Sequence, residues 1–321
     1  MNGPGVIAVT GLRTHVGKRL VERLLGDGAR RLIGLDRRRP YRLDERVTFR
    51  RIDLVAPTAD AQIAALLEEE RVEALVHCAF RSDPTPDTEL DYELETIGSR
   101  NVMTACAAAR VRRIVLASST MVYGPRRDNP NFLTEDHPLR GHPDAHCVQN
   151  RVEVESDLQG WLRSHPDAEV TVLRPCWMLG PRHRDGGVRY LTLPVVPTVM
   201  GFDPLLQFVH EDDVIHAFER ATLAPHPGVF NVVGRGVLPL SMALRLAGRR
   251  RVPLPTPLLY RASAAPARAQ TGDAPAGFFD YLRYLWVDDG ERGWEAFGEP
   301  SYSAKEAWIS AVSALRMRHY A

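Results

Sequence analysis

The chain has 321 residues, of which 44% are hydrophobic and 25% are charged, and its formal net charge is +1. This composition is typical of a water-soluble globular protein, and so small a net charge gives no general attraction to nucleic acid or anionic lipid. No apolar run approaches the ~20 residues that cross a bilayer, and the N-terminus passes from a short apolar run straight into a glycine turn. We therefore expect a cytoplasmic protein with neither nucleic-acid nor membrane partners.

The spacing of the cysteines and histidines does not predict a metal site. The cysteines show no CxxC spacing, and the histidines form no HExxH or other paired-ligand pattern. Zinc sites and disulfide frameworks are recognised by such spacings. We expect neither in this chain.

Short apolar runs alternate with segments of helical periodicity through the first half of the chain. Buried parallel strands are expected at 6–10, 31–36, 47–53, 73–79, 112–119 and 169–175. Between them, apolar residues recur every three to four positions, as from Val16 to Leu25. This alternation predicts an α/β fold, a Rossmann-type doubly wound parallel sheet with helices on both faces.

The chain changes character after residue 175, where prolines become frequent and apolar spacing irregular. We expect 1–175 to form the Rossmann domain and 176–321 to form mainly a smaller C-terminal substrate-binding lobe, with about 205–235 returning to the Rossmann sheet. One more strand is expected at 229–233 and a final helix at 303–315. The proline- and alanine-rich segment 253–277 is expected to be a loop.

The first strand leads directly into TGLRTHVG, residues 10–17, which opens the first helix. Gly11 and Gly17 permit a tight turn and close packing, although Thr14 replaces the usual middle glycine. The free N–H groups at the helix start attract a pyrophosphate. Asp36 ends the second strand, where an acid can bind the adenosine ribose. We expect an NAD(P) site here; the alternative is a strand–turn–helix without a ligand.

The charged residues near this turn favour different cofactors. Asp36 would repel a 2′-phosphate and favours NAD. Arg13 in the turn and the run Arg37, Arg38 and Arg39 suit a 2′-phosphate, because guanidinium groups bind phosphate well. We expect NADPH, with NADH possible; the alternative is that the arginines are simply solvated.

Several motifs together resemble the extended short-chain dehydrogenase/reductase family, the group of NAD-dependent epimerases and dehydratases. TGLRTHVG resembles its TGxxGxxG, HCA (77–79) its HxAA, SSTMVYG (118–124) its SSxxVYG and FVHEDDV (208–214) its FVHVDDV. The resemblance covers nearly the whole chain and implies the same fold. Beside the residues named above, it assigns to cofactor binding His15, Val16, Asp53, Leu54, Cys78, Ala79, Arg151 and Pro175.

In this family a serine and a YxxxK pair carry the chemistry. The serine polarises the substrate oxygen, the tyrosine transfers its proton, and the lysine lowers the tyrosine's pKa and holds the nicotinamide ribose. The serine matches Ser119. Thr120 beside it is a second group that could orient a carbonyl.

The YxxxK pair itself is missing. Aligning RVEVE (151–155) with the family's KxxxE puts Cys147 at the tyrosine and Arg151 at the lysine. A register shifted by one gives His146 and Asn150 instead. Glu95 stands where the family often has an asparagine. We expect Cys147 to be a small buried thiol that makes room for substrate rather than the proton donor, because a thiol is short and hydrogen-bonds weakly.

Some extended reductases of antibiotic biosynthesis lack this pair, and the chain is similar to that class. The resemblance implies an NAD(P)H-dependent ketoreductase acting on an aromatic, angucyclinone-like polyketide, with the proton supplied by a substrate phenol or a water. Apolar residues of 191–200 could form a wall for such a ligand; the alternative is that they form lobe core. The substrate-contacting residues we expect are Glu95, Tyr123, Cys176, Trp177, Met178 and Gln207.

Two other functions remain open: a non-catalytic NAD(P) sensor and a nucleotide-sugar epimerase or dehydratase. Sugar enzymes of the family commonly carry an arginine just before the FVH stretch, where this chain has Gln207. The expected partner is the small-molecule substrate. A homodimer through the helices of 88–109 and 148–164 would fit the family.

Overall fold

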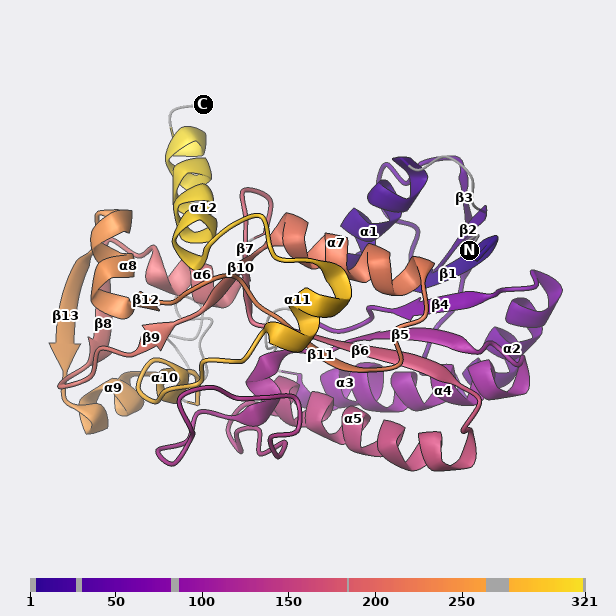
Figure 1. Cartoon of the computed structure of the whole chain (residues 1–321), viewed down its shortest axis with the longest axis horizontal. Helices are drawn as coiled ribbons and strands as arrows, with labels where there is room; N and C mark the ends of the chain where they lie inside the picture. Colours follow the sequence, from indigo (N-terminus) through magenta and orange to yellow (C-terminus); the bar gives the residue numbers. More distant parts are fainter. Residues whose placement is uncertain (1–3, 27–30, 82–86, 184, 264–276, 320–321) are drawn as a thin grey trace.

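The computed structural model describes residues 4–26, 31–81, 87–183, 185–263 and 277–319. Within this part of the chain, seven parallel strands form one sheet in the order β11-β6-β5-β4-β1-β2-β3 (Figure 1). The strands are β1 (Val6–Thr10), β2 (Arg31–Asp36), β3 (Val47–Arg51), β4 (Ala74–His77), β5 (Arg113–Ala117), β6 (Glu169–Pro175) and β11 (Gly228–Val232). The predicted doubly wound Rossmann-type sheet is confirmed.

Helices cover both faces of this sheet (Figure 1). One face carries α1 (His15–Gly26) and α7 (Glu211–Leu223); the other carries α2 (Ala59–Glu69), α4 (Gly98–Ala108) and α5 (His146–Ser164). The helix α1 buries Leu20, Val21, Leu24 and Leu25, the face that its periodicity predicted. Two shorter pieces precede α4, namely α3 (Thr88–Tyr92) and the π-helical turn η1 (Glu93–Ile97).

A second lobe is built from short strand pairs and helices (Figure 1). Its strands are β7 (Trp177–Leu179), β8 (Val195–Val199), β9 (Leu205–Leu206), β10 (Phe208–His210), β12 (Leu238–Pro239) and β13 (Arg250–Leu254). Its helices are α6 (Gly186–Leu191), α8 (Leu240–Ala247), α9 (Thr256–Ser263), α10 (Phe278–Tyr281) and α12 (Ala304–His319). The helix α11 (Glu291–Phe297) instead packs on β11 and α7 of the main sheet.

Of two predictions for this lobe, the final helix is confirmed and the loop at 253–277 is wrong in part. The final helix is present as α12, whose apolar residues pack on the lobe core. The loop expected at 253–277 is wrong where α9 forms, because Leu259 there is buried in that core. Residues 264–276 of that segment lie outside the described residues. None of the described helices is both long and apolar enough to cross a membrane.

The strand order determines where a ligand can bind. The chain moves outward from β1 to β2 and β3, then returns to β4 on the other side of β1 and continues to β5, β6 and β11. The helices after β1 and β4 therefore leave on opposite faces and open a crevice at the strands' carboxyl ends. Gly11 and Ala79 both lie at this crevice.

A buried ion pair ties β6 to α5 and to the turn after β5. Arg174 and Glu155 are 2% and 3% exposed, and Arg174 Nε donates to Glu155 Oε1 at 3.0 Å. Ser118 donates its hydroxyl to the same carboxylate, and Arg174 Nη1 donates to the Tyr123 hydroxyl at 2.7 Å. The turn η2 (Thr120–Tyr123) is thereby held against the end of β6.

We predict that Glu155→Ala lowers the free energy of unfolding by about 3–5 kcal/mol, because it leaves the Arg174 charge buried without its counter-ion. Urea denaturation of the full chain measures this loss. The control is Glu153→Ala on the same helix, whose partially exposed pair with Arg100 should contribute only ~0–1 kcal/mol. Similar losses in both variants would contradict the prediction.

Candidate functional site

The turn between β1 and α1 requires its two glycines. Gly11 has φ +71°, and a Cβ there would lie 2.6 Å from the Cys78 carbonyl carbon and oxygen. A Cβ at Gly17 would lie 2.3 Å from the Gly11 oxygen. Both distances are far below van der Waals contact, so the turn packs against the end of β4, and α1 packs against the turn, only because these side chains are absent.

Thr14 fits the position where a middle glycine is usual. Its hydroxyl donates to the Gly11 oxygen at 2.8 Å and accepts from the Gly17 N–H at 3.1 Å. The threonine therefore fastens the turn to the first turn of α1. Its side chain is directed back into the turn, which leaves the crevice open in front of it.

A cavity of about 700 Å³ lies at this crevice, large enough for a dinucleotide. The predicted cofactor residues that line it are Gly11, Arg13, Thr14, His15, Asp36, Arg37, Asp53, Leu54 and Ala79. They come from the ends of β1, β2, β3 and β4, so the fold brings together residues from four separate motifs. The closely packed glycine turn and the acid at the end of β2 fit a dinucleotide cofactor.

The carboxylate of Asp36 is fixed by two backbone groups. The Arg13 N–H donates to Oδ2 at 3.3 Å and the Arg38 N–H donates to Oδ1 at 3.3 Å. Of the arginine run, Arg37 lines the cavity, whereas the Arg39 guanidinium lies 6.0 Å from the centre of the Phe49 ring. The acid is thus an integral part of the cavity wall.

Other predicted cofactor residues support the cavity without lining it. Gly17 is buried at the start of α1, and Val16 packs on the core beneath the turn. Cys78 and Pro175 are buried, and burial raises the pKa of the Cys78 thiol. Arg38 contributes its backbone N–H to Asp36. Their direct contact with a cofactor stays a prediction.

Several residues line the cavity beyond those predicted from the sequence. They are Lys18, Leu35, Ile52, Val55, Phe80, Arg81, Leu90, Leu94, Arg182 and His183. Arg182 and His183 follow β7, far along the chain, and no motif marks them. The His183 ring lies edge-on to His15 at 4.8 Å, and His15 Nε2 lies 2.6 Å from Glu211 Oε2.

Glu211 joins these segments beside the start of α1. Burial would raise the pKa of its carboxyl, but hydrogen bonds from His15 and from the Arg182 N–H hold that pKa below its usual value. The carboxylate therefore stays charged and fixes His15 at the start of α1. A charge pattern in the sequence could not have shown this contact, because His15 lies far from Arg182 and Glu211 along the chain.

The serine motif forms a tight turn after β5. Ser119 has an extended backbone and its hydroxyl accepts from the Met121 N–H at 3.3 Å. Thr120 is fully buried and its hydroxyl interacts with the Asp288 carboxyl, whose pKa burial raises well above normal. Ser119 is partly exposed and is therefore the more accessible of the two hydroxyls.

Cys147 and Arg151 lie one turn apart at the start of α5. Arg151 Nη1 donates to the Cys147 oxygen at 3.0 Å, and Nη2 donates to the Arg81 oxygen at 2.6 Å. The guanidinium also lies 5.5 Å from the centre of the Phe80 ring. Burial raises the pKa of the Cys147 thiol, although the Arg151 charge partly opposes this. The thiol therefore stays protonated at neutral pH.

A buried tyrosine that the sequence analysis did not identify lies beside this pair. Tyr281 in α10 is fully buried, and its hydroxyl donates to the Met121 oxygen at 2.8 Å. Burial raises its pKa well above normal, and the Cys147 thiol adds to this effect. The second lobe thus reaches the start of α5 through Tyr281.

Residues expected to contact the substrate mostly have structural partners. Tyr123 is fully buried between Arg174 and Asn231. The Gln207 amide makes two hydrogen bonds to the backbone of Asp288, at 3.0 and 2.9 Å. Cys176 is buried in the core beneath the sheet, and Met178 packs against that core. Contact of these residues with a substrate stays a prediction.

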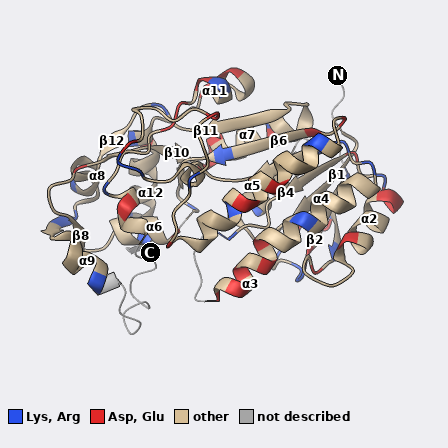
Figure 2. Ribbon diagram, turned by 90° about the horizontal axis from the view of Figure 1, so that it is seen from below, with Lys and Arg blue, Asp and Glu red and all other residues tan. Residues whose placement is uncertain are grey.

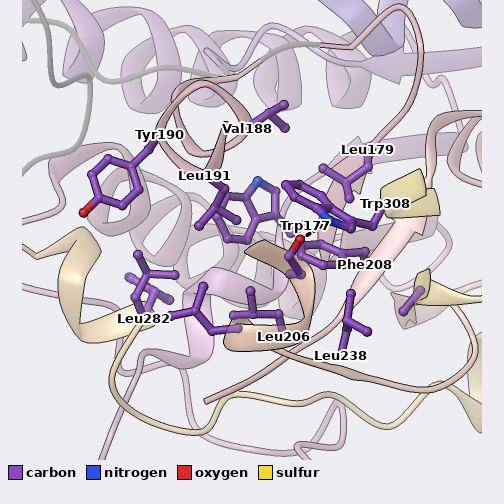
Figure 3. Packing of buried hydrophobic residues seen from close by; sticks show 14 of the residues in the cluster. Trp177, Leu179, Val188, Tyr190, Leu191, Leu206, Phe208, Leu238, Leu282 and Trp308 are labelled. Carbon is purple, nitrogen blue, oxygen red and sulfur yellow. Dashed lines mark hydrogen bonds between the residues drawn. The ribbon is translucent and has the colours of Figure 1, made fainter. Parts of the chain in front are cut away.

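The apolar stretch proposed as a ligand wall divides between core and surface. Trp177 and Leu191 pack with Phe208, Trp308 and their neighbours in the core of the second lobe (Figure 3). Val195 and Met200 are instead 48% and 52% exposed. The alternative considered from the sequence, that these residues form lobe core, therefore holds for Trp177, Leu191, Val196 and Val199.

Comparisons with known proteins agree with this architecture. The NAD dependent epimerase/dehydratase family model matches residues 7–233. The uncharacterized protein Rv0501 of Mycobacterium tuberculosis (strain ATCC 25618 / H37Rv) is 32% identical over 314 residues, 95% of this chain and 82% of that protein. The UDP-glucose 4-epimerase of Mycolicibacterium smegmatis is 28% identical over 250 residues, 71% of this chain and 77% of that protein.

A solved structure shows the same fold. The UDP-glucose 4-epimerase of Thermus thermophilus, in its complex with NAD, has a TM-score of 0.73 at 22% identity, over 97% of this chain and 99% of that chain. The narrower expectation, an angucyclinone ketoreductase such as that of simocyclinone assembly, stays a prediction, as does the absence of the Tyr/Lys pair. The resemblance to the extended short-chain dehydrogenase/reductases is confirmed at the level of the family: the chain belongs to the NAD dependent epimerase/dehydratase family.

Proposed function

We propose that the protein is an NAD-dependent oxidoreductase of the epimerase/dehydratase type that acts on a nucleotide sugar. The cavity at the ends of β1, β2 and β4 carries this proposal, because it joins the glycine turn to the fixed carboxylate of Asp36. That carboxylate would bind the adenosine ribose hydroxyls and would repel a 2′-phosphate. We therefore favour NAD over the NADPH suggested by the arginine run.

The substrate class rests on the relatives and on the packing of the second lobe. The Mycolicibacterium smegmatis relative and the Thermus thermophilus structure are both named as UDP-glucose 4-epimerases. An aromatic polyketide has less support than it had from the sequence, because Trp177, Leu191 and Val196 pack against one another in the lobe core. A sugar needs no such apolar wall.

The cofactor, when bound, accepts or returns a hydride at a carbinol carbon. Gly11, Thr14 and Asp36 would hold it, and Ser119 would hydrogen-bond the substrate oxygen whose carbon exchanges the hydride. Oxidation of a secondary alcohol also releases the hydroxyl proton. With a neutral thiol at Cys147, that proton passes through Ser119 to water, and the rate lacks the ~10²–10⁴-fold that a positioned acid–base group supplies.

A second candidate is the ketoreductase implied by the family's atypical members. The small protonated thiol of Cys147 favours it, because a substrate with a phenol next to its ketone could donate its own proton. The two candidates differ in substrate, so one panel of nucleotide sugars and aromatic ketones distinguishes them. Tight NAD binding without turnover of any compound would instead favour the sensor.

Asp36→Asn should change the cofactor preference. We predict that the ratio of the NADPH and NADH dissociation constants falls about tenfold, because the charge that repels the 2′-phosphate is lost. Nucleotide fluorescence titration measures both constants. Asp44→Asn, a carboxylate of the β2–β3 connection outside the cavity, is the control. An unchanged ratio in the Asp36 variant would contradict the assignment of NAD.

The variants Ser119→Ala and Cys147→Ala should distinguish the roles of the two side chains in the reaction. We predict that Ser119→Ala lowers kcat about 100-fold, by loss of the hydrogen bond to the substrate oxygen, while Cys147→Ala keeps kcat within about threefold of wild type. The measurement is NAD(H) absorbance with the substrate that the panel identifies.

The dependence of kcat on pH gives an independent check on whether the Cys147 thiol transfers a proton. Because burial raises the Cys147 pKa, wild type should show no alkaline limb near the ordinary thiol pKa of about 8.5, and Cys147→Ala should give the same profile. A wild-type limb that disappears in Cys147→Ala would mean that the thiol transfers the proton.

A further inference from the structure

A buried carboxylate faces the reacting end of the site where the resembled family has a neutral asparagine. Glu95 lies in the π-helical turn η1, in which the Gly98 N–H donates to the Glu93 oxygen. This wider turn places Glu95 inward with none of its surface exposed. Single π-turns of this kind occur frequently at functional sites.

Both oxygens of Glu95 accept hydrogen bonds. The Arg81 N–H donates to Oε1 at 2.8 Å, and Asn150 Nδ2 donates to Oε2 at 3.0 Å. Asn150 is itself 5% exposed. Burial raises the pKa of Glu95, and the charge of Arg151 opposes that rise. Both hydrogen bonds favour the ionised form and so also lower the pKa of this carboxyl.

Glu95 and Arg151 hold the same residue's backbone from two sides. Glu95 accepts from the Arg81 N–H, while Arg151 donates to the Arg81 oxygen at 2.6 Å. The Arg81 side chain points elsewhere, with Nε 2.8 Å from Asp91 Oδ1. Phe80, Arg81 and Leu94 line the cofactor cavity, so the carboxylate lies directly behind the wall of that cavity.

The charge at this end of the site therefore differs from that of the resembled family. The resemblance places a lysine at position 151 and often a neutral asparagine at position 95. Here Arg151 is balanced by Glu95, and Cys147 is neutral. Asp91 adds a further negative charge nearby, paired with Arg81. Figure 2 shows acidic residues on α3, a basic residue on α4 and residues of both signs on α5.

We propose that Glu95 biases the bound cofactor towards its oxidised form, NAD+. The oxidised nicotinamide ring carries a positive charge that the reduced ring lacks. A carboxylate behind a low-dielectric wall attracts that charge and leaves the affinity for NADH nearly unchanged. The inference rests on the proposed binding of NAD in this cavity. An enzyme that binds NAD+ in preference to NADH holds the oxidised cofactor ready to oxidise an alcohol. The NADH that forms then returns its hydride readily.

Two neutral variants test the bias in the full chain, Glu95→Gln and Glu95→Asn. The second restores the residue type that the family often carries and guards against misfolding of the first. The dissociation constants of NAD+ and NADH are measured by calorimetry and by fluorescence, without any substrate. We expect the preference for NAD+ over NADH to fall about tenfold, which corresponds to ~1.4 kcal/mol.

Glu93→Gln is the matched control, because Glu93 lies in the same π-turn, is exposed and carries the same charge. It should leave the ratio of the two constants within about twofold of wild type. An unchanged ratio in the Glu95 variants, or an equal fall in Glu93→Gln, would overturn the inference while leaving NAD binding intact. Failure of the wild type to bind either nucleotide would overturn the proposed function as well.

Discussion

The buried pair of Arg174 and Glu155 is the interaction on which the geometry of the site depends. It joins the end of β6 to the middle of α5, and through Ser118 and Tyr123 it also holds the turn that carries Ser119. Two charges removed from water are tolerated only when their remaining hydrogen-bonding groups are satisfied. The surrounding hydroxyls meet that requirement and, in doing so, fix the distance between the serine turn and the helix that carries Cys147 and Arg151.

The start of α5 carries side chains that differ in chemistry from those of the resembled family, although the architecture is the same. Arg151 occupies the lysine position, but two of its nitrogens donate to the backbone oxygens of Cys147 and Arg81. Its fork of donors suits this bridging better than an ammonium group, which has one nitrogen. The residue that would tune a tyrosine in the resembled family here holds the cavity wall in place. Tyr281 reaches the same region from the second lobe, so a small side chain at position 147 also leaves space for contact between the lobes.

The strands and the dinucleotide turn could be predicted from the sequence because they depend on local patterns. Buried parallel strands are continuous apolar runs, and the turn needs Gly11 where a Cβ would strike the Cys78 backbone. The helix α9 was missed because prolines flank it and because Leu259 gains its burial from distant residues. Arg182, His183 and Tyr281 reach the site only through the fold, and no spacing in the sequence records that. For Gln207, its position beside a motif predicted a substrate contact; the hydrogen bonds of its amide to the Asp288 backbone depend on the fold and could not be predicted from the sequence.

One set of polar contacts joins the start of α5 to the wall of the cavity. Arg151 and Glu95 both bind the backbone of Arg81, the first at its carbonyl oxygen and the second at its N–H. In the proposed role of Glu95, its charge offsets that of Arg151 at the wall of the cavity, and its position behind Arg81 and Phe80 keeps it away from water. The arginine and the carboxylate are therefore understood together, since replacing Arg151 alone would leave Glu95 as a buried carboxylate without its neighbouring positive charge.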